Sequence, residues 1–334
     1  MSALRGAAER PLLPQVASAI VEIRRHLPLA APSPTFRHLA FGSGFLVQLR
    51  DASVRLLKSA DGSAIAEVPL ARPRVAVALP AGSVLACGSD ECQRFDPGQV
   101  KPHRLGRISL LPDAILEPSR ETQERVWVIE PTFARAVRYT LGEPTSEVES
   151  TSELPGYDRG AITTLADGAF LYTAGQSVVR ALGRARRAMP LPDGVARPWR
   201  LLPAERADRA WVISAQGEAF LLELTGRAHV LRRFATEGHP FDVASAKAAL
   251  ALVSIHEDQA EERTFVLNLY SAAGTQTKSY LLGKVGESAD PEWAAMASRD
   301  REVVLAERPP RVAVGGSTAL RLFELVSGDE IVTR

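Results

Sequence analysis

The chain has 334 residues, of which 46% are hydrophobic and 24% charged, and its formal net charge is +1. That length is enough for one large closed domain or two ordinary ones. The near-neutral charge gives no bulk attraction to nucleic acid or to an anionic membrane, so we expect neither as a partner. Arginine supplies 35 of the 40 basic residues, which is typical of a GC-rich bacterial genome.

The N-terminal region carries no uninterrupted apolar core, because Pro11 and Pro14 break it, and we read no secretory signal there. No stretch approaches the roughly 18 apolar residues of a transmembrane helix. A cytoplasmic protein is therefore expected. Residues 1–33 form an N-terminal extension that either closes the ring described below or is a loosely attached tail. Residues 330–334 compete for that closing position as an outer strand.

A proline followed closely by an apolar residue marks the start of each of seven units along the chain. Proline suits the start of a strand, where no ladder donor is needed. The spacing of about 42 residues predicts a repeated fold. The marks are Pro34 with Phe36, Pro73 with Val75, Pro112 with Ala114, Pro155 with Tyr157, Pro198 with Trp199, Pro240 with Phe241, and Pro291 with Trp293.

Each unit also contains a compact apolar run, which we interpret as its second strand. These runs are too short for helices and rich in Val, Ile and aromatic residues, as in strands buried on both faces. A glycine turn follows the third strand in several units, and the fourth strand is more polar, as an outer edge strand should be. The runs are 45–47, 83–86, 126–129, 169–172, 210–213, 250–253 and 303–306.

Four strands per unit, repeated seven times, predict an all-β fold, a seven-bladed β-propeller of four-stranded antiparallel blades over residues 34–334. A β-sandwich with a second domain is the alternative. The predicted blades are 34–71, 72–108, 109–153, 154–195, 196–238, 239–285 and 286–334.

The pattern of third strand and glycine turn at 220–229, 267–277 and 320–331 resembles that of WD-repeat and quinoprotein-like β-propellers. The resemblance covers about residues 34–334 and is limited to the fold. It implies a toroid with two flat faces and a central channel. The Trp-Asp pair of WD repeats and the tryptophan-docking signature of quinoprotein propellers are absent, so the resemblance implies no quinone cofactor.

Two cysteines, Cys87 and Cys92, flank a short turn where we place a strand, a turn and a strand. A disulfide across this hairpin is one interpretation. Two reduced thiols are the preferred one, because disulfides are rare in the cytosol. Two thiols are too few for a zinc site.

No constellation fixes a chemistry, and we predict no catalytic residue, no cofactor and no metal ligand. The chain lacks a G-x-S-x-G motif and phosphate-binding glycine loops. His256 with Glu257 and Asp258 is the best local cation cluster, although an exposed hairpin tip explains it better. Asp113, Asp158 and Asp242 follow the strand-start prolines and are candidate carboxylates, although aspartate is common in turns.

An arginine-rich strip precedes the fifth unit and would suit an anionic partner, although a solvated outer edge with protective charges is the preferred explanation. Nucleic-acid binding is not expected, because few aromatic residues lie nearby for stacking. The strip comprises Arg180, Arg184, Arg186, Arg187, Arg197 and Arg200.

The expected function is a non-enzymatic scaffold or adaptor that binds protein partners through the propeller face with the longer loops. The alternative is an enzyme or small-ligand binder at the mouth of the central channel. We place blade seven's ERPPRVAVGGS stretch (307–317) between its second and third strands, on the same face as the aromatic loop residues. The candidate partner-binding residues are Phe133, Tyr157, Trp199, His239, His256, Arg308 and Arg311.

Overall fold

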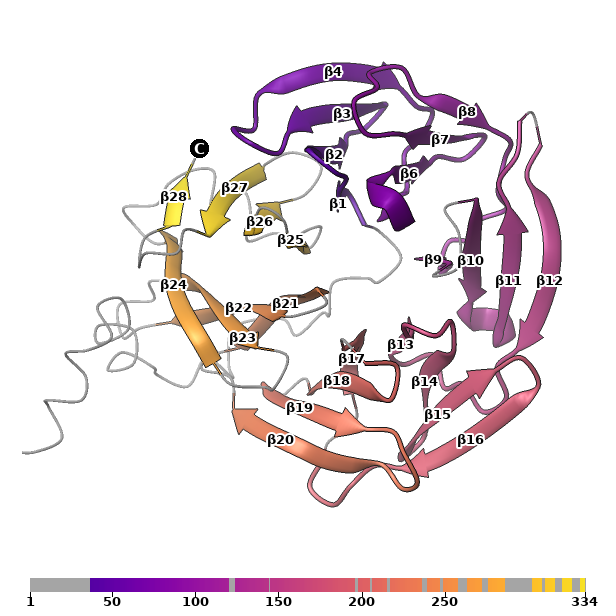
Figure 1. The fold of residues 1–334 in the computed structure, drawn as a ribbon, viewed down its shortest axis with the longest axis vertical. Helices are drawn as coiled ribbons and strands as arrows, with labels where there is room; N and C mark the ends of the chain where they lie inside the picture. The colour runs from indigo at the N-terminus through magenta and orange to yellow at the C-terminus, as the bar shows by residue number, and fades with distance from the viewer. Residues whose placement is uncertain are drawn as a thin grey trace, which may run out of the picture.

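The computed structural model describes the chain from residue 37 onward, with several internal gaps. The residues outside its description are 1–36, 120–123, 144, 196–197, 205, 215–216, 236–238, 247–248, 258–262, 272–275, 286–301, 308–309, 316–319, 326–330 and 334. The described residues form 28 strands in seven four-stranded antiparallel sheets. Figure 1 shows these sheets as blades around a central axis, with the first strand of each blade innermost and the fourth outermost. The predicted seven-bladed β-propeller is confirmed.

Each blade is built from four consecutive strands, which follow one another through hairpins. The first three blades are β1 (Leu39–Phe41), β2 (Phe45–Leu49), β3 (Ser53–Lys58), β4 (Ala64–Pro69); β5 (Val75–Ala78), β6 (Val84–Cys87), β7 (Cys92–Phe95), β8 (His103–Leu105); and β9 (Ile115–Pro118), β10 (Arg125–Glu130), β11 (Arg135–Thr140), β12 (Glu147–Glu153).

The remaining four blades follow the same order around the ring. They are β13 (Ile162–Thr164), β14 (Phe170–Ala174), β15 (Ser177–Leu182), β16 (Ala185–Pro190); β17 (Pro198–Pro203), β18 (Arg209–Ser214), β19 (Glu218–Glu223), β20 (His229–Ala235); β21 (His239–Ala246), β22 (Ala249–Glu257), β23 (Arg263–Ser271), β24 (Gln276–Val285); and β25 (Glu302–Glu307), β26 (Pro310–Gly315), β27 (Leu320–Leu325), β28 (Ile331–Thr333).

Burial across a blade follows from its position between two neighbours. The second strands β2 and β6 are buried along their whole length, whereas the outer strands β4, β12 and β16 are mostly exposed or half-buried. A second strand has a neighbouring blade against each face, so the short apolar runs in the sequence have no wet side. The outer strand has one unpaired edge and carries the polar residues.

Every described strand falls inside the predicted blade to which it belongs, but the assignment within blade seven is wrong. The run 303–306 lies in β25, the first strand of that blade, and the second strand is β26. Both strands are short and apolar, so composition does not distinguish them. The consequence is that Arg311, near the start of β26, lies toward the other face of the propeller.

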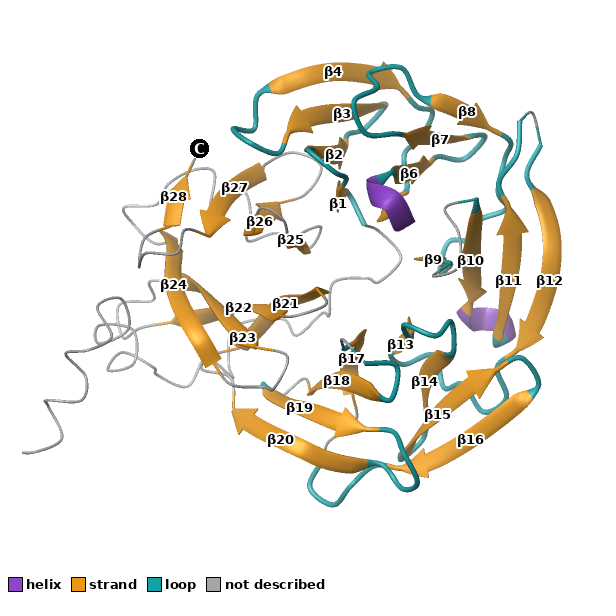
Figure 2. Cartoon of the chain, in the orientation of Figure 1, coloured by secondary structure: helices purple, strands orange, loops and turns teal. Residues whose placement is uncertain are grey.

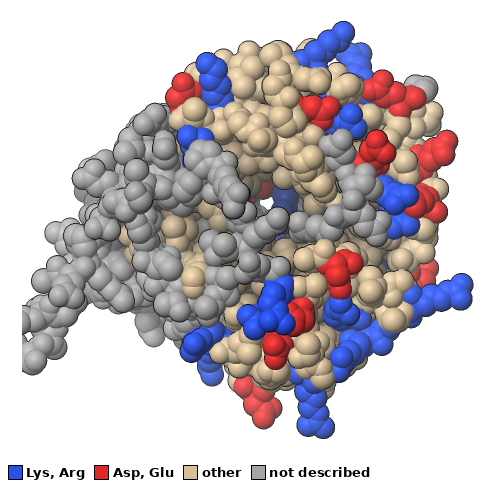
Figure 3. Space-filling model, viewed as in Figure 1, with Lys and Arg blue, Asp and Glu red and all other residues tan. Residues whose placement is uncertain are grey.

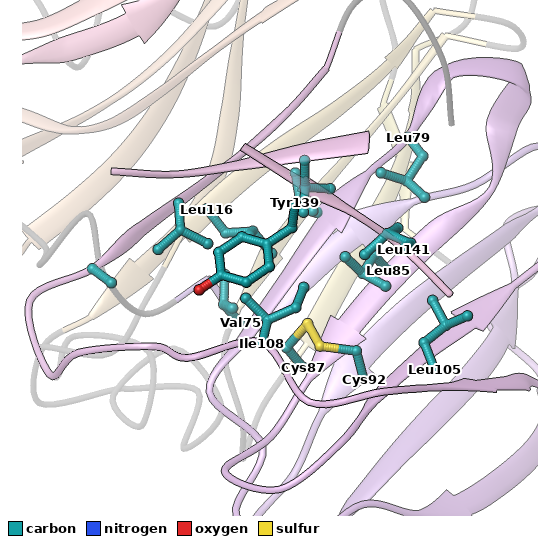
Figure 4. Packing of buried hydrophobic residues seen from close by; sticks show 14 of the residues in the cluster. Val75, Leu79, Leu85, Cys87, Cys92, Leu105, Ile108, Leu116, Tyr139 and Leu141 are labelled. Atoms are coloured by element: carbon teal, nitrogen blue, oxygen red, sulfur yellow. A yellow bond between two sulfur atoms is a disulfide. The ribbon is translucent and has the colours of Figure 1, made fainter. Parts of the chain in front are cut away.

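Apolar side chains from adjacent blades form the core between them. Figure 4 shows one such cluster between blades two and three, in which Tyr139 and Ile108 lie close to Val75. Cys87 and Cys92 belong to the same cluster and are joined by a disulfide. They stand opposite each other in the β6–β7 pair, with their Cα atoms 4.1 Å apart. The expectation of two reduced thiols is therefore wrong, because the hairpin register brings the two sulfurs together.

The ring closes where blade seven meets blade one. Leu39 and Phe41 of β1 pack against Ala313 and Leu322 of blade seven in a shared cluster. The described outer strand of blade seven is β28, which pairs with β27. The expectation that residues 1–33 close the ring concerns residues outside the described part of the chain.

The two faces of the propeller follow from this topology. The term "linker face" is used here for the side that carries the connections between blades and those between second and third strands. The "hairpin face" carries the connections between first and second and between third and fourth strands. The 3₁₀ turns η2 (Pro80–Gly82) and η3 (Pro131–Phe133) lie on the hairpin and linker faces respectively, and Figure 2 draws both in purple. No helix among the described residues is long and apolar enough to cross a membrane.

Candidate functional site

The linker face presents Phe133 on a short rigid turn between β10 and β11. Its side chain is 55% exposed, and the guanidinium of Arg135 lies 5.1 Å from the centre of its ring. The backbone N–H and hydroxyl of Thr132 donate to Asp113 Oδ2 at 3.1 and 2.5 Å. Ala134 then takes the left-handed conformation that ends the turn. Phe133 is thus an exposed aromatic ring held by a fixed backbone, the arrangement expected of an interface anchor.

Arg135 is itself held in place beside Phe133. Its Nε donates to the carboxylate of Glu130, which is buried at the end of β10, and this hydrogen bond raises the pKa of Arg135. A cation fixed over an aromatic ring adds a polar contact to an apolar one. Sequence reasoning identified Phe133 but not Arg135.

Tyr157 lies in the connection from blade three to blade four, but its side chain is buried. Its hydroxyl donates to the carbonyl of Gly160 at 2.9 Å, and its ring meets Tyr172 edge-on at 5.8 Å. Burial raises the pKa of the Tyr157 hydroxyl. Tyr157 therefore packs two blades together at this place in the ring, and the folded chain does not offer its ring at the surface.

Trp199 is half-buried at the start of β17. It packs against the cluster between blades five and six that includes Trp211, and the guanidinium of Arg200 lies 5.1 Å from the centre of its indole ring. The rest of the side chain's surface is exposed, at the end of β17 that lies toward the linker face. Trp199 is therefore partly available, and less so than Phe133.

Arg311 is buried in β26, and its Nη1 donates to the hydroxyl of Ser59 at 3.3 Å across the seam between blades seven and one. It therefore lies inside the ring near the hairpin face, where sequence reasoning had expected an exposed residue of the linker face. Arg308 lies outside the described residues.

His239 is the first residue of β21, and His256 lies near the end of β22. Both backbone positions lie toward the linker face. His239 pairs with Ile255 in the strand register, so the backbone positions of the two histidines are close. Their side chains lie outside the described part of the structure, as does the acidic segment 258–262. Among the described residues, no group of three or more His, Cys, Asp or Glu side chains is placed to hold a metal ion.

The three aspartates singled out as candidate carboxylates each have local partners. Asp113 accepts from Thr132, as described above. Asp158 accepts from the N–H of Gly160 at 3.0 Å and from the hydroxyl of Thr173 at 2.6 Å. Both fix turns on the linker face. Asp242 belongs to a different group, at the centre of the ring.

Four charged side chains meet where the innermost strands of three blades approach the start of blade one, and sequence reasoning did not assemble them. This central charge cluster consists of Arg37, Arg200, Asp242 and Glu302. Asp242 Oδ2 accepts from the N–H of Val303 at 2.8 Å, and its Oδ1 lies 3.6 Å from Arg200 Nη2. Glu302 accepts from the N–H of Leu39 across the ring seam. In this way each carboxylate connects its own blade to the next.

Burial dominates the electrostatics of this central charge cluster. Desolvation raises the pKa of Glu302 to about 8, with Asp242 adding to the rise while Arg37 and two backbone N–H groups oppose it. Burial likewise lowers the pKa of Arg200, against the attraction of Asp242. Figure 3 shows an opening at the middle of the ring with acidic and basic atoms at its bottom. A related contact recurs between blades three and four, where the hydroxyl of Thr164 donates to Glu117 at 3.2 Å.

Comparison with known proteins supports the fold alone. No family model matches the chain, and no curated protein matches it. Solved structures do match over most of their length. Kluyveromyces lactis Hsv2 is 10% identical with a TM-score of 0.56, over 90% of this chain and 96% of that one. Virginiamycin B lyase from Staphylococcus aureus is 12% identical with a TM-score of 0.56, over 90% and 98%.

A protein from Desulfotomaculum acetoxidans, described as functionally unknown, gives a TM-score of 0.58 at 13% identity, over 86% of this chain and 94% of that one. These neighbours differ in kind, since one is a lyase by name. Identities this low show a shared propeller architecture. The functional argument therefore has to come from the surface of this chain.

Proposed function

We propose that this chain is a non-enzymatic β-propeller scaffold or adaptor that binds a protein partner on its linker face, within a bacterial multi-protein system. The observation that carries the proposal is the exposure of Phe133 on a turn fixed by Asp113. A rigid aromatic ring with an adjacent arginine loses little conformational freedom on binding and buries a large area. The same proposal includes a relationship to WD-repeat-like propellers, which the pattern of third strands and glycine turns suggests.

The test compares Phe133→Ala with a matched control on the opposite face. Val100 is 52% exposed and lies between β7 and β8, on the hairpin face. Wild type, Phe133→Ala and Val100→Ala are immobilised as baits in lysate of the source organism. A specific partner is retained by wild type and Val100→Ala and lost from Phe133→Ala.

The partner is then purified and its affinity measured by titration calorimetry. Loss of a central aromatic anchor costs about 2 kcal/mol or more, which is about a 30-fold rise in Kd. The proposal fails if the three baits retain the same proteins, or if Phe133→Ala leaves the Kd of the purified complex unchanged.

A second candidate is a small-ligand binder or enzyme at the channel mouth, which the convergence of Asp242 and Glu302 favours. Paired carboxylates in a low-dielectric site are a common basis for acid–base chemistry. Both carboxylates connect blades in this fold, so we rank this candidate second. A thermal-shift screen of small cationic and zwitterionic compounds tests it: a ligand of this site raises the melting temperature of wild type and not that of Glu302→Gln.

A further inference from the structure

The outer strand of blade four carries arginines that pair with no acidic side chain in the part of the chain that the structure describes. Arg184 and Arg187 are exposed in the β15–β16 turn and in β16, and Arg227 is exposed in the turn before β20. Arg186 is half-buried beside them. These four residues are referred to below as the rim arginines. Figure 3 shows basic side chains along the lower edge of the ring, where Figure 1 places β16 and β20.

Backbone carbonyls hold two of the rim arginines, and these contacts fix the side chains without cancelling their charge. Arg186 Nη2 donates to the backbone carbonyl of Glu153 in blade three at 3.0 Å, and Arg187 Nη2 donates to the carbonyl of Gly226 in blade five. The guanidinium groups are thus spread from one blade to the next. Other arginines in these blades differ in this respect, because Arg180 pairs with Asp167 and Arg233 with Glu218.

The backbone beside these charges has an open edge. β16 pairs with β15 alone among the described strands, in a continuous register from Leu182 opposite Ala185. The two residues that flank a two-residue hairpin turn exchange two backbone hydrogen bonds with each other. Along the two strands, such hydrogen-bonded residue pairs alternate with pairs whose N–H and C=O groups point away from the partner strand. The N–H and C=O groups of Arg186 and Ala188 therefore point outward. Ala188 is exposed, and so is Leu182 at 47%.

We propose that β16 and the rim arginines bind an extended acidic segment of a partner protein, which adds to blade four as a fifth strand. The open edge supplies main-chain hydrogen bonds, and arginines on both sides of β16 supply charge complementarity. This surface lies at the rim of the ring and is separate from the proposed Phe133 site on the linker face.

An acidic polypeptide fits this surface better than a nucleic acid does. Among the Phe, Tyr and Trp side chains that the structure describes, only Phe133 is exposed, and it belongs to blade three. Single strands need stacking platforms as well as charge. The net charge of +1 also gives the molecule no broad positive field to hold a long polyanion.

The probe is a fluorescein-labelled peptide whose sequence, EVESTSE, is that of β12, an acidic strand that is extended in this structure. Its control is the same peptide with each Glu replaced by Gln. Binding is measured by fluorescence anisotropy at 50 mM and 500 mM NaCl. Wild type is expected to bind the acidic peptide at least tenfold more tightly than the control peptide, and more weakly at high salt.

Two variants separate the roles of charge and strand pairing. The triple variant Arg184→Glu, Arg187→Glu, Arg227→Glu is expected to weaken binding at least tenfold. Ala188→Pro removes one outward N–H that blade four does not use, and is also expected to weaken binding at least tenfold. The charge control is Arg50→Glu, Arg104→Glu, Arg107→Glu, three exposed arginines of blades one and two, with binding within twofold of wild type.

Melting temperatures establish that each variant is folded before binding is compared. The proposal is overturned if wild type does not prefer the acidic peptide, or if the triple variant binds it as wild type does. Undiminished binding by Ala188→Pro shows ionic contact without strand addition and overturns it too. Tighter binding of a labelled oligonucleotide than of the peptide, lost in the triple variant, assigns the surface to nucleic acid and also overturns it. If the whole chain self-associates at micromolar concentration, and the triple variant does not, the occupant of this edge is a second copy of the chain, which also overturns the proposal.

Discussion

The central charge cluster and the rim arginines carry charge in opposite ways. Asp242 and Glu302 are buried at the middle of the ring, and Arg200 is largely buried beside them. These groups are engaged with one another or with backbone N–H groups of the next blade. Arg184, Arg187 and Arg227 are exposed at the rim and have no carboxylate partner among the described residues. A buried charge is costly unless it is paired, whereas an exposed charge costs little to leave unpaired. Ionisable side chains therefore join blades at the centre through paired contacts, whereas charge is available for binding at the rim.

The largest effect is expected from removing a carboxylate of the central charge cluster. Asp242→Ala leaves the buried guanidinium of Arg200 without its acidic partner and the N–H of Val303 without its acceptor. Breaking one side of a buried pair costs about 3–5 kcal/mol. The loss of stability is measured as the difference between the free energies of unfolding of wild type and Asp242→Ala in urea titrations. Asp208→Ala, which breaks an exposed pair with Arg206, is the control and should leave the urea midpoint nearly unchanged. Equal effects of the two substitutions would remove the contrast between centre and rim.

A pH dependence is expected from Glu302. Its pKa is raised from 4.5 to about 8 in the folded chain, where Arg37, Asp242 and Arg200 face it. The folded protein thus retains a proton that the unfolded chain releases, so stability falls as pH rises from about 4.5 to 8. The slope from this single group is at most about 1.4 kcal/mol per pH unit.

Glu302→Gln is neutral throughout and should flatten this part of the profile. Urea titrations at pH 5, 6, 7 and 8 compare wild type with the variant. A wild-type profile that the substitution leaves unchanged would mean that Glu302 is ionised in the folded ring at all these values.

The smallest effect on stability is expected at the rim. Arg184→Ala and Arg227→Ala should change the free energy of unfolding by less than about 0.5 kcal/mol, because neither side chain has a charged partner to lose. The same urea titration measures both. A loss of 2 kcal/mol or more from either would show that the rim arginines hold blades four and five together, and would make them resemble the central residues.

The linker-face residues show how far sequence reasoning reaches for a candidate site. The topology could be predicted, so Phe133 was correctly placed in the turn between the second and third strands of blade three. Exposure could not be predicted, because the same strand-start pattern gives a buried Tyr157 and a half-buried Trp199. Arg311 was misplaced because β25 and β26 are equally apolar, and the wrong one was taken as the second strand of blade seven.

The sequence by itself determined the number of blades and, in the first six blades, which strand is the second and that it is buried. Those properties rest on local signals, namely strand-start prolines, short apolar runs and glycine turns, which repeat because each blade must fill the same wedge. Only the tertiary structure decided which charges meet. Arg37, Arg200, Asp242 and Glu302 are far apart in the chain and come together when the ring closes. The Cys87–Cys92 disulfide depends likewise on a strand register that composition leaves open. Long-range pairing of side chains follows from ring geometry, which no local pattern encodes.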